Sequence, residues 1–162
     1  MKVASKALAI ISLLIIVAGC GIYSFSPGGK SSIKTIAVTQ FENKTIEYGL
    51  SSRMTDLVVD AFLSDGNLKV VSPSDADAVL VGTLTNYERK PYTYDESDNV
   101  SQYVVKLVFD ITLKGEGDKE LWTERFYSEG IYSADDQTEE DGQALAADKL
   151  VVDIINRTTK SW

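Results

Sequence analysis

The chain has one cysteine, Cys20, and no histidine, which limits the chemistry open to it. A single cysteine cannot form a disulfide within the chain. Nucleophilic catalysis by a Cys–His or Ser–His pair needs a histidine, and zinc and iron–sulfur sites need several Cys or His ligands. We therefore expect no catalytic residues, no metal site, no cofactor and no enzyme activity. The chemistry that remains for Cys20 is modification of its thiol.

The residues before Cys20 predict an export signal. Lys2 and Lys6 precede an apolar run at 7–17, which is shorter than the roughly 20 residues that a membrane-spanning helix needs. Residues 1–19 are therefore predicted to be a signal peptide that is removed. The run ends in Val17-Ala18-Gly19-Cys20, which resembles the lipobox of bacterial lipoproteins.

That resemblance implies that the chain is cut before Cys20 and that Cys20 carries three fatty chains. One chain gives only marginal membrane binding, whereas two or more hold a protein stably. The alternative is a soluble secreted protein whose free cysteine happens to lie near its cleavage site. Residues 20–34, which include the Gly- and Ser-rich run at 27–32, are predicted to be the lipidated amino terminus and a flexible tether.

Residues 35–162 are predicted to form a single domain, because this length supports one hydrophobic core. The whole chain has a formal net charge of −8, and loss of the two lysines in 1–19 changes this to −10. Nucleic-acid binding requires a basic face, so we expect no nucleic-acid partner. The acidic surface also gives no attraction to anionic lipids, so a membrane contact would depend on the acyl chains.

Two kinds of hydrophobic periodicity alternate along this domain. Alternation typical of strands occurs at 33–39, 78–87, 103–114 and 120–127, and 68–71 is either a short strand or an extended run. Apolar residues at three- and four-residue steps predict two helices. The first spans about 48–64 and is closed by Gly66, and the second runs from a capping box at Thr138 to about Thr159. The order predicts an α+β two-layer sandwich: a mainly antiparallel sheet of about four strands, with two helices packed on one face.

The outer face of the predicted strand 103–114 is only partly polar, since it carries Val104 and Val108 among charged residues. A partly apolar open face is a candidate for contact with a partner. Scattered surface valines are the alternative interpretation.

Several segments together resemble the LptE family of lipopolysaccharide-assembly lipoproteins. They are the start Cys20-Gly21-Ile22-Tyr23-Ser24-Phe25, Ile36-Ala37-Val38 followed by Phe41-Glu42-Asn43-Lys44-Thr45, Asp77-Ala78-Val79-Leu80-Val81-Gly82, the strand that ends at Lys114, Leu121-Trp122 and the Ala-rich C-terminal helix. The resemblance implies a lipid-anchored protein of the Gram-negative outer membrane that sits as a plug within a large β-barrel, LptD. The two proteins would form the translocon that delivers lipopolysaccharide to the cell surface. Members of the family are expected to bind lipopolysaccharide and to assist assembly of the barrel.

The resemblance also directs attention to Arg89, Lys90, Tyr92 and Tyr94, which lie in a polar stretch at 88–99 that we predict to be a loop between strands. Lipopolysaccharide carries phosphates, and Arg and Lys are the side chains that bind phosphate. We therefore expect these four residues to contact the glycolipid or the barrel. The alternative is an ordinary solvated basic pair, and the acidic balance of the chain argues against tight phosphate binding.

A different class of function stays open. Periplasmic regulatory or secretion lipoproteins, such as peptidoglycan-synthase activators and curli-secretion lipoproteins, begin their α+β domains with a similar strand and loop. A hydrolase that uses carboxylates alone is a third option, but the sequence shows no recognisable acid pair for it.

Overall fold

The alternating segment that predicts the longest strand lies between the two other long strands of the sheet. The computed structural model describes residues 33–160, and these belong to one compact unit, Ser31–Trp162. The predicted signal peptide, Cys20 and all but the last two residues of the predicted tether lie outside the described residues. Strand β5 spans Val100–Lys114. Successive side chains of a strand point to opposite faces, and one face of β5 is fully buried: Val105, Leu107, Phe109, Ile111 and Leu113.

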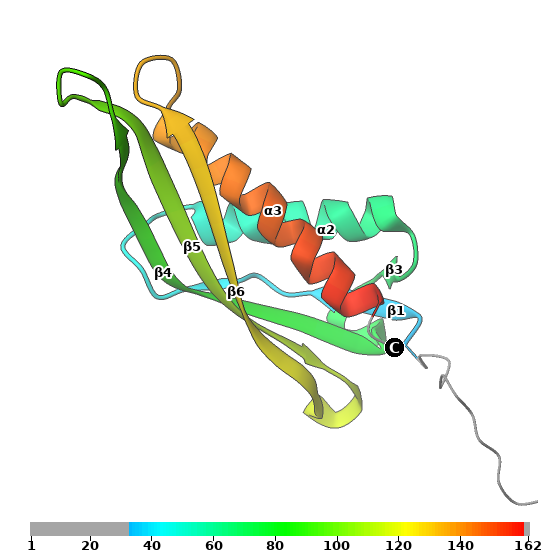
Figure 1. Cartoon of the computed structure of the whole chain (residues 1–162). Helices are drawn as coiled ribbons and strands as arrows, with labels where there is room; N and C mark the ends of the chain where they lie inside the picture. The colour runs from blue at the N-terminus through cyan, green and yellow to red at the C-terminus, as the bar shows by residue number, and fades with distance from the viewer. Residues whose placement is uncertain (1–32, 161–162) are drawn as a thin grey trace, which may run out of the picture. The chain divides into compact units, whose positions relative to one another are not determined.

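Two long antiparallel strands flank β5, as the pattern predicts (Figure 1). They are β4, Ala78–Tyr94, and β6, Glu120–Ser133. A 3-10 turn at Glu116–Asp118 joins β5 to β6. The β4–β5 turn is closed by the carboxylate of Asp95, whose Oδ1 accepts hydrogen bonds from the backbone N–H groups of Ser97 and Asn99 at 2.8 and 2.9 Å. Both β4 and β6 are longer than the sequence predicts.

Three short strands complete a mixed sheet in the order β3-β1-β4-β5-β6, with β2 also pairing with β4. They are β1, Thr35–Val38; β2, Glu42–Asn43; and β3, Lys69–Val70. All of their pairings are parallel. The α+β class is confirmed, but the prediction of about four strands is wrong, because the sheet formed by residues 33–160 has six. Strands of two residues are too short to show an alternating pattern.

Asp77 aligns the start of β1 with the start of β4. Its Oδ2 accepts hydrogen bonds from the backbone N–H groups of Lys34 and Thr35 at 2.8 and 2.9 Å. These hydrogen bonds favour the ionised form and hold the pKa of the Asp77 carboxyl below its ordinary value.

Helices α2, Leu50–Asp65, and α3, Glu139–Thr159, pack on one face of the sheet (Figure 1). Gly66 ends α2 in the left-handed conformation, with φ of 68°, as predicted. The predicted capping box of α3 is also present: Thr138 accepts from the N–H of Asp141, and the Asp141 carboxylate accepts from the N–H of Thr138. Both helices and the inner face of the sheet form one hydrophobic core. Neither helix of the described part combines the length and hydrophobicity needed to span a bilayer.

Helix α3 approaches β6 closely because glycines face each other across the contact. A Cβ atom at Gly130 of β6 would lie 1.9 Å from the carbonyl oxygen of Gly142 of α3. Ser128 of β6 also donates a hydrogen bond of 2.5 Å to the carbonyl of Ala146. The N-terminal half of α3 is therefore held against β6 at nearly backbone-to-backbone distance.

Candidate functional site

The four residues expected to contact a ligand or partner lie in a strand, not in a loop. Arg89, Lys90, Tyr92 and Tyr94 all belong to β4, so the predicted loop at 88–99 is wrong and only the turn after Tyr94 remains of it. The strand continues because β5 pairs with it up to Tyr94. Pro91 is tolerated there because, among the described residues, no strand pairs with the other side of β4 beyond Leu84.

Arg89 lies on the helix face of β4 and is partly buried, with 38% of its side chain exposed. Its Nε donates a hydrogen bond of 2.5 Å to the hydroxyl of Tyr132 and lies 3.2 Å from the carboxylate of Glu139 at the start of α3. Its guanidinium carbon lies 3.8 Å from the centre of the Tyr103 ring, which stacks on Tyr132 with 5.6 Å between ring centres. Arg89 therefore joins β4, β5, β6 and α3.

A second polar group lies beside Arg89 and extends to the loop before α2. Tyr87 donates a hydrogen bond to Glu139, and the side-chain amide of Gln143 donates to Tyr87 at 3.1 Å and to Glu47 at 2.9 Å. Burial, together with the hydrogen bond to Glu139, raises the pKa of Tyr87 far above its ordinary value, so this phenol stays protonated. We call Tyr87, Arg89, Glu139 and Gln143 the polar hub.

Loss of the Arg89 side chain should loosen the polar hub. We expect Arg89→Gln to lower the free energy of unfolding by about 1–2 kcal/mol, because it removes the cation–π contact with Tyr103 and the ion pair with Glu139. The value is modest because the Arg89 side chain is 38% exposed and water screens the pair. Urea unfolding measures the change, and hydrogen exchange should show faster exchange in the first turns of α3.

Lys90→Gln is the matched control for this variant. Lys90 lies next to Arg89 in the chain, but its ion pair with Glu88 is 3.5 Å long and exposed on both sides. We expect its effect to stay within about 0.5 kcal/mol. Equal destabilisation by both variants would show that the polar hub does not support the domain.

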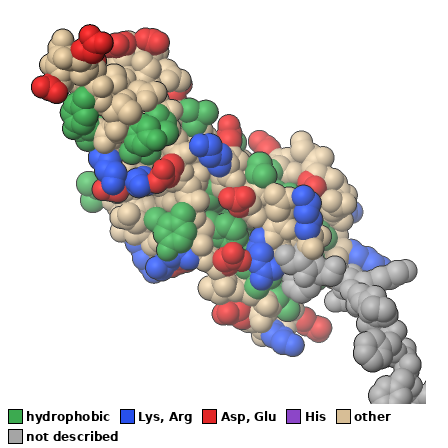
Figure 2. Space-filling view, in the orientation of Figure 1, with side chains coloured by type: hydrophobic (Ala, Val, Ile, Leu, Met, Phe, Trp, Pro, Cys, Tyr) green, Lys and Arg blue, Asp and Glu red, His purple; other side chains and the backbone are tan. Residues whose placement is uncertain are grey.

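Lys90, Tyr92 and Tyr94 remain accessible on the arm formed by the ends of β4 and β5. Tyr92 is 51% exposed and Tyr94 is 59% exposed. The turn beyond them is acidic, with Asp95, Glu96 and Asp98. Figure 2 shows acidic side chains gathered at this end of the domain, with hydrophobic side chains next to them. Three of the four predicted residues are therefore accessible on the arm. Arg89 is partly exposed but is engaged by Tyr103, Tyr132 and Glu139.

The open face of the sheet carries a ladder of paired charges between β5 and β6. Lys106 forms an ion pair with Glu129, and Arg125 donates two hydrogen bonds, of 2.6 and 2.8 Å, to Asp110. Each partner favours ionisation of the carboxyl group, so the pKa values of Asp110 and Glu129 lie below their ordinary values. This face is polar but locally neutral.

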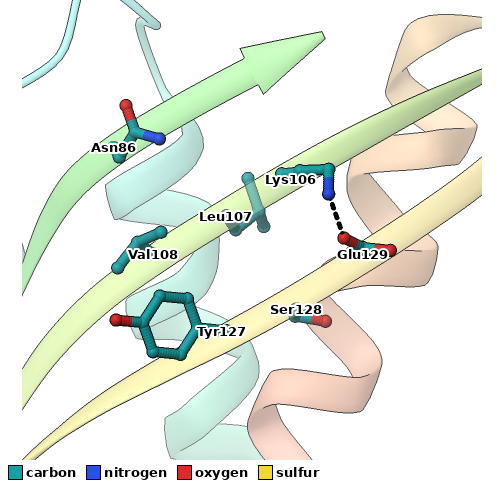
Figure 3. Close-up of a pocket in the computed structure, with 7 residues that line it drawn as sticks. All are labelled: Asn86, Lys106, Leu107, Val108, Tyr127, Ser128 and Glu129. Carbon is teal, nitrogen blue, oxygen red and sulfur yellow. Dashed lines mark hydrogen bonds and ion pairs between the residues drawn. The ribbon is translucent and has the colours of Figure 1, made fainter. Parts of the chain in front are cut away.

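An apolar hollow interrupts the ladder between its two ion pairs. Its volume is about 240 Å³, and Figure 3 shows its lining: Asn86, Lys106, Leu107, Val108, Tyr127, Ser128 and Glu129. The ring of Tyr127 is 67% exposed. Of the two valines predicted on this face, Val108 lines the hollow, whereas Val104 does not line it and is 1% exposed. The predicted partly apolar open face is present, and Tyr127 adds exposed aromatic surface to it.

Sequence reasoning missed Tyr127, although a signal for it exists. Along β6 the buried side chains of Trp122 and Phe126 have even numbers, and Tyr127 has the opposite parity. That parity places Tyr127 on the open face. Within residues 33–160, no three His, Cys, Asp or Glu side chains lie together as metal ligands would. The arm and the open face carry exposed tyrosines, a side chain that is enriched at protein interfaces.

Comparison with known families identifies the domain. The family model LptE, described as lipopolysaccharide-assembly, matches residues 33–158. The chain belongs to the LptE family. The match spans both helices and the whole sheet, so the arm, the polar hub and the open face are all parts of the LptE domain. LptE is a family of lipopolysaccharide assembly and not of enzymes.

Solved structures share the fold of this LptE-family domain at low sequence identity. A protein of Xanthomonas campestris has a TM-score of 0.59 and 12% identity, over 78% of this chain and 83% of its own. A hypothetical protein of Chlamydia trachomatis has a TM-score of 0.57 and 10% identity, over 77% of this chain and 95% of its own. A Caulobacter crescentus protein named as a lipoprotein has a TM-score of 0.51 and 15% identity, over 75% and 89% of the two chains. No curated protein sequence matches the chain significantly.

Proposed function

We propose that this protein is an outer-membrane lipoprotein that acts as the plug and assembly subunit of the LptD barrel translocon, which delivers lipopolysaccharide to the cell surface. The observation that carries the proposal is the LptE match over residues 33–158. The protein works in the cell envelope without catalysis. Its partners are the barrel, lipopolysaccharide and the membrane that holds its acyl chains.

The chemistry of the domain surface suits a polar barrel lumen. The lumen of an outer-membrane barrel is polar, and the open face of the sheet presents neutralised ion pairs around the hollow at Tyr127. A plug must also keep its shape, and the polar hub joins α3 to three strands. The domain can therefore fill a lumen without leaving unpaired charges on this face.

We assign the contact residues to the exposed side of the arm. Lys90 is the basic group there, and Tyr92 and Tyr94 provide exposed aromatic surface beside it. Arg89 supports this side from the opposite face of β4, through Tyr103 and Tyr132. The division of the chain completes the proposal: a signal peptide at 1–19, a lipidated amino terminus and tether at 20–34, and the domain at 35–162.

Co-purification tests the partner. We expect the tagged full chain, extracted in mild detergent, to bring down a large β-barrel protein. A Tyr92→Ala, Tyr94→Ala double variant should recover several-fold less barrel, because aromatic anchors carry much of the energy of an interface. A Lys119→Gln variant, in the turn between β5 and β6, is the control and should recover as much barrel as the wild type.

The same experiment discriminates the other class of function. Recovery of a peptidoglycan synthase in place of a barrel would contradict the plug role and favour a regulatory lipoprotein. Equal recovery of the barrel by the double variant would keep the plug role and move the contact away from the arm.

A further inference from the structure

The loop between β2 and α2 presents two apolar side chains almost completely to solvent. Ile46 is 90% exposed and Tyr48 is 93% exposed, which makes them the most exposed large hydrophobic side chains of the described residues. Water contact with such side chains is unfavourable. A loop that displays two of them, with a single residue between them, is a candidate contact surface. We call residues 44–49 the apolar loop.

Hydrogen bonds fix the shape of the apolar loop before any partner arrives. Asn43 Oδ1 accepts from the backbone N–H of Thr45 at 2.8 Å, and Thr45 Oγ1 accepts from the N–H of Glu47 at 3.1 Å. The side-chain amide of Asn43 donates to the carbonyl of Glu47 at 2.5 Å. The N–H of Lys44 donates to the carbonyl of Leu84 at 2.9 Å, which fastens the loop to β4.

Glu47, between the two apolar residues, is turned toward the domain. Its carboxylate accepts from Gln143 of the polar hub at 2.9 Å, so the polar side chain of the segment is held inward while Ile46 and Tyr48 remain in solvent. A contact surface that is already ordered loses little conformational entropy on binding. The loop is therefore built to present these two side chains.

We infer that the apolar loop docks into the interfacial layer of a lipid bilayer, with Ile46 and Tyr48 inserted. Tyrosine prefers the membrane–water interface, where its ring meets hydrocarbon and its hydroxyl stays wet. The polar lumen of a barrel does not match this loop. Two side chains also provide far less than the roughly 800 Å² that each partner buries in a stable protein interface. The inference rests on the proposed acyl anchor, because a contact this small is weak on its own.

The anchor and the loop can reach the same membrane. Residues 21–33 lie between Cys20 and the domain and span at most about 45 Å when fully extended. The ten residues from Thr35 to Thr45 separate the start of the domain from the loop by at most about 35 Å. Once one part of a molecule is tethered to a surface, a second weak contact with that surface becomes intramolecular and is strongly favoured.

Docking through this loop would orient the domain on the membrane. The loop is fastened to β4 at Leu84, near the middle of the strand, so this side of the domain would face the bilayer. The contact should not depend on anionic lipid, because the chain has a net charge of −8 and gains nothing from a negative surface.

A single fluorescent label tests the inference in the full acylated chain. Ile46→Cys provides one free thiol for a polarity-sensitive nitrobenzoxadiazole label, because Cys20 is the only native cysteine and carries the acyl chains. In vesicles of phosphatidylcholine and phosphatidylethanolamine we expect a blue-shifted and several-fold brighter emission, quenched by lipids brominated near the headgroup. Leu63→Cys, which is 61% exposed on α2 but lies outside the loop, is the matched control and should keep the emission of a label in water.

Each outcome decides a different point. If the protein floats with the vesicles but the label at position 46 stays water-like, the docking inference is overturned and the acyl anchor stands. If the protein does not float at all, the anchor fails and the docking that depends on it fails too. A label that becomes buried only when the barrel is added would show a protein site in place of the bilayer and would also overturn the inference.

Discussion

Gly130→Ala is expected to lower the free energy of unfolding by about 3 kcal/mol. The new methyl group would lie 1.9 Å from the carbonyl oxygen of Gly142 and 2.8 Å from the backbone nitrogen of Ala146. Both neighbours are backbone atoms of α3, so no side-chain rotation can make room. The whole helix must move away from β6, and overpacking of this kind usually costs 1–3 kcal/mol or more.

Urea unfolding of the folded chain measures this effect, and Gly115→Ala is the matched control. The atoms nearest to a Cβ at Gly115 belong to the side chain of Leu121, at 3.2 Å, and that side chain can rotate. We expect the control to change stability by no more than about 0.5 kcal/mol. If both variants unfolded at the same urea concentration, α3 could not be packed against β6 at this short distance.

The close approach of α3 to β6 also supports the surfaces proposed for function. Gly142 is followed in the chain by Gln143, which donates to Tyr87 and to Glu47. A helix displaced from Gly130 would carry Gln143 away from both partners. The shape of the apolar loop and the stiffness of the arm therefore depend on two glycines that touch neither surface. Gly130→Ala should accordingly raise hydrogen exchange at Glu47 as well as in α3.

The elements that could be predicted from sequence are those whose burial follows a strict period. Strand β5 has a fully buried face and a mixed face, and the alternation of apolar residues along it reports this directly. Helix α3 begins at a capping box whose residues are local in sequence. The two-residue strands β2 and β3 have no period, because their existence depends on parallel pairing with distant residues.

The outer half of β4 could not be predicted, because its residues are exposed on both faces and Pro91 interrupts the pattern. The orientation of Arg89 has a more specific cause. The register between β4 and β5 shifts between Leu84 and Asn86, which leaves Thr85 as an extra residue. Without this bulge, Lys90 would share the inner face with Leu84, and Arg89 would point outward. The bulge exchanges the faces on which the Lys90 and Arg89 side chains lie, and no local feature of the sequence predicts it.

The exposure of the apolar loop could not be predicted from the sequence, for a different reason. Its sequence, Lys44 to Gly49, has no period and reads as a connection between a strand and a helix. The exposure of Ile46 and Tyr48 follows from hydrogen bonds made by Asn43, Thr45 and Gln143, and Gln143 lies 96 residues from Glu47. A contact at that separation cannot be inferred from one sequence.

Cys20→Ala is expected to move the protein from the membrane fraction to the soluble fraction of the periplasm. Each CH₂ group of an acyl chain contributes about 0.8 kcal/mol to membrane binding, so the loss of three chains removes far more binding energy than any surface contact of the domain provides. Fractionation followed by blotting measures the change, and mass spectrometry of the wild type should show the added mass of the acyl chains. Ser24→Ala, four residues further along, is the control and should stay in the membrane fraction with that mass.

The same variant also shows which of the two proposed membrane contacts, the acyl chains or the apolar loop, binds more strongly. The apolar loop adds two side chains, which hold a tethered domain in one orientation but cannot retain a free one. Cys20→Ala should therefore be released even though Ile46 and Tyr48 are intact. Retention of the variant in the membrane fraction would place the anchor elsewhere in the protein. An unmodified thiol on the processed wild-type chain would remove the basis of the outer-membrane placement.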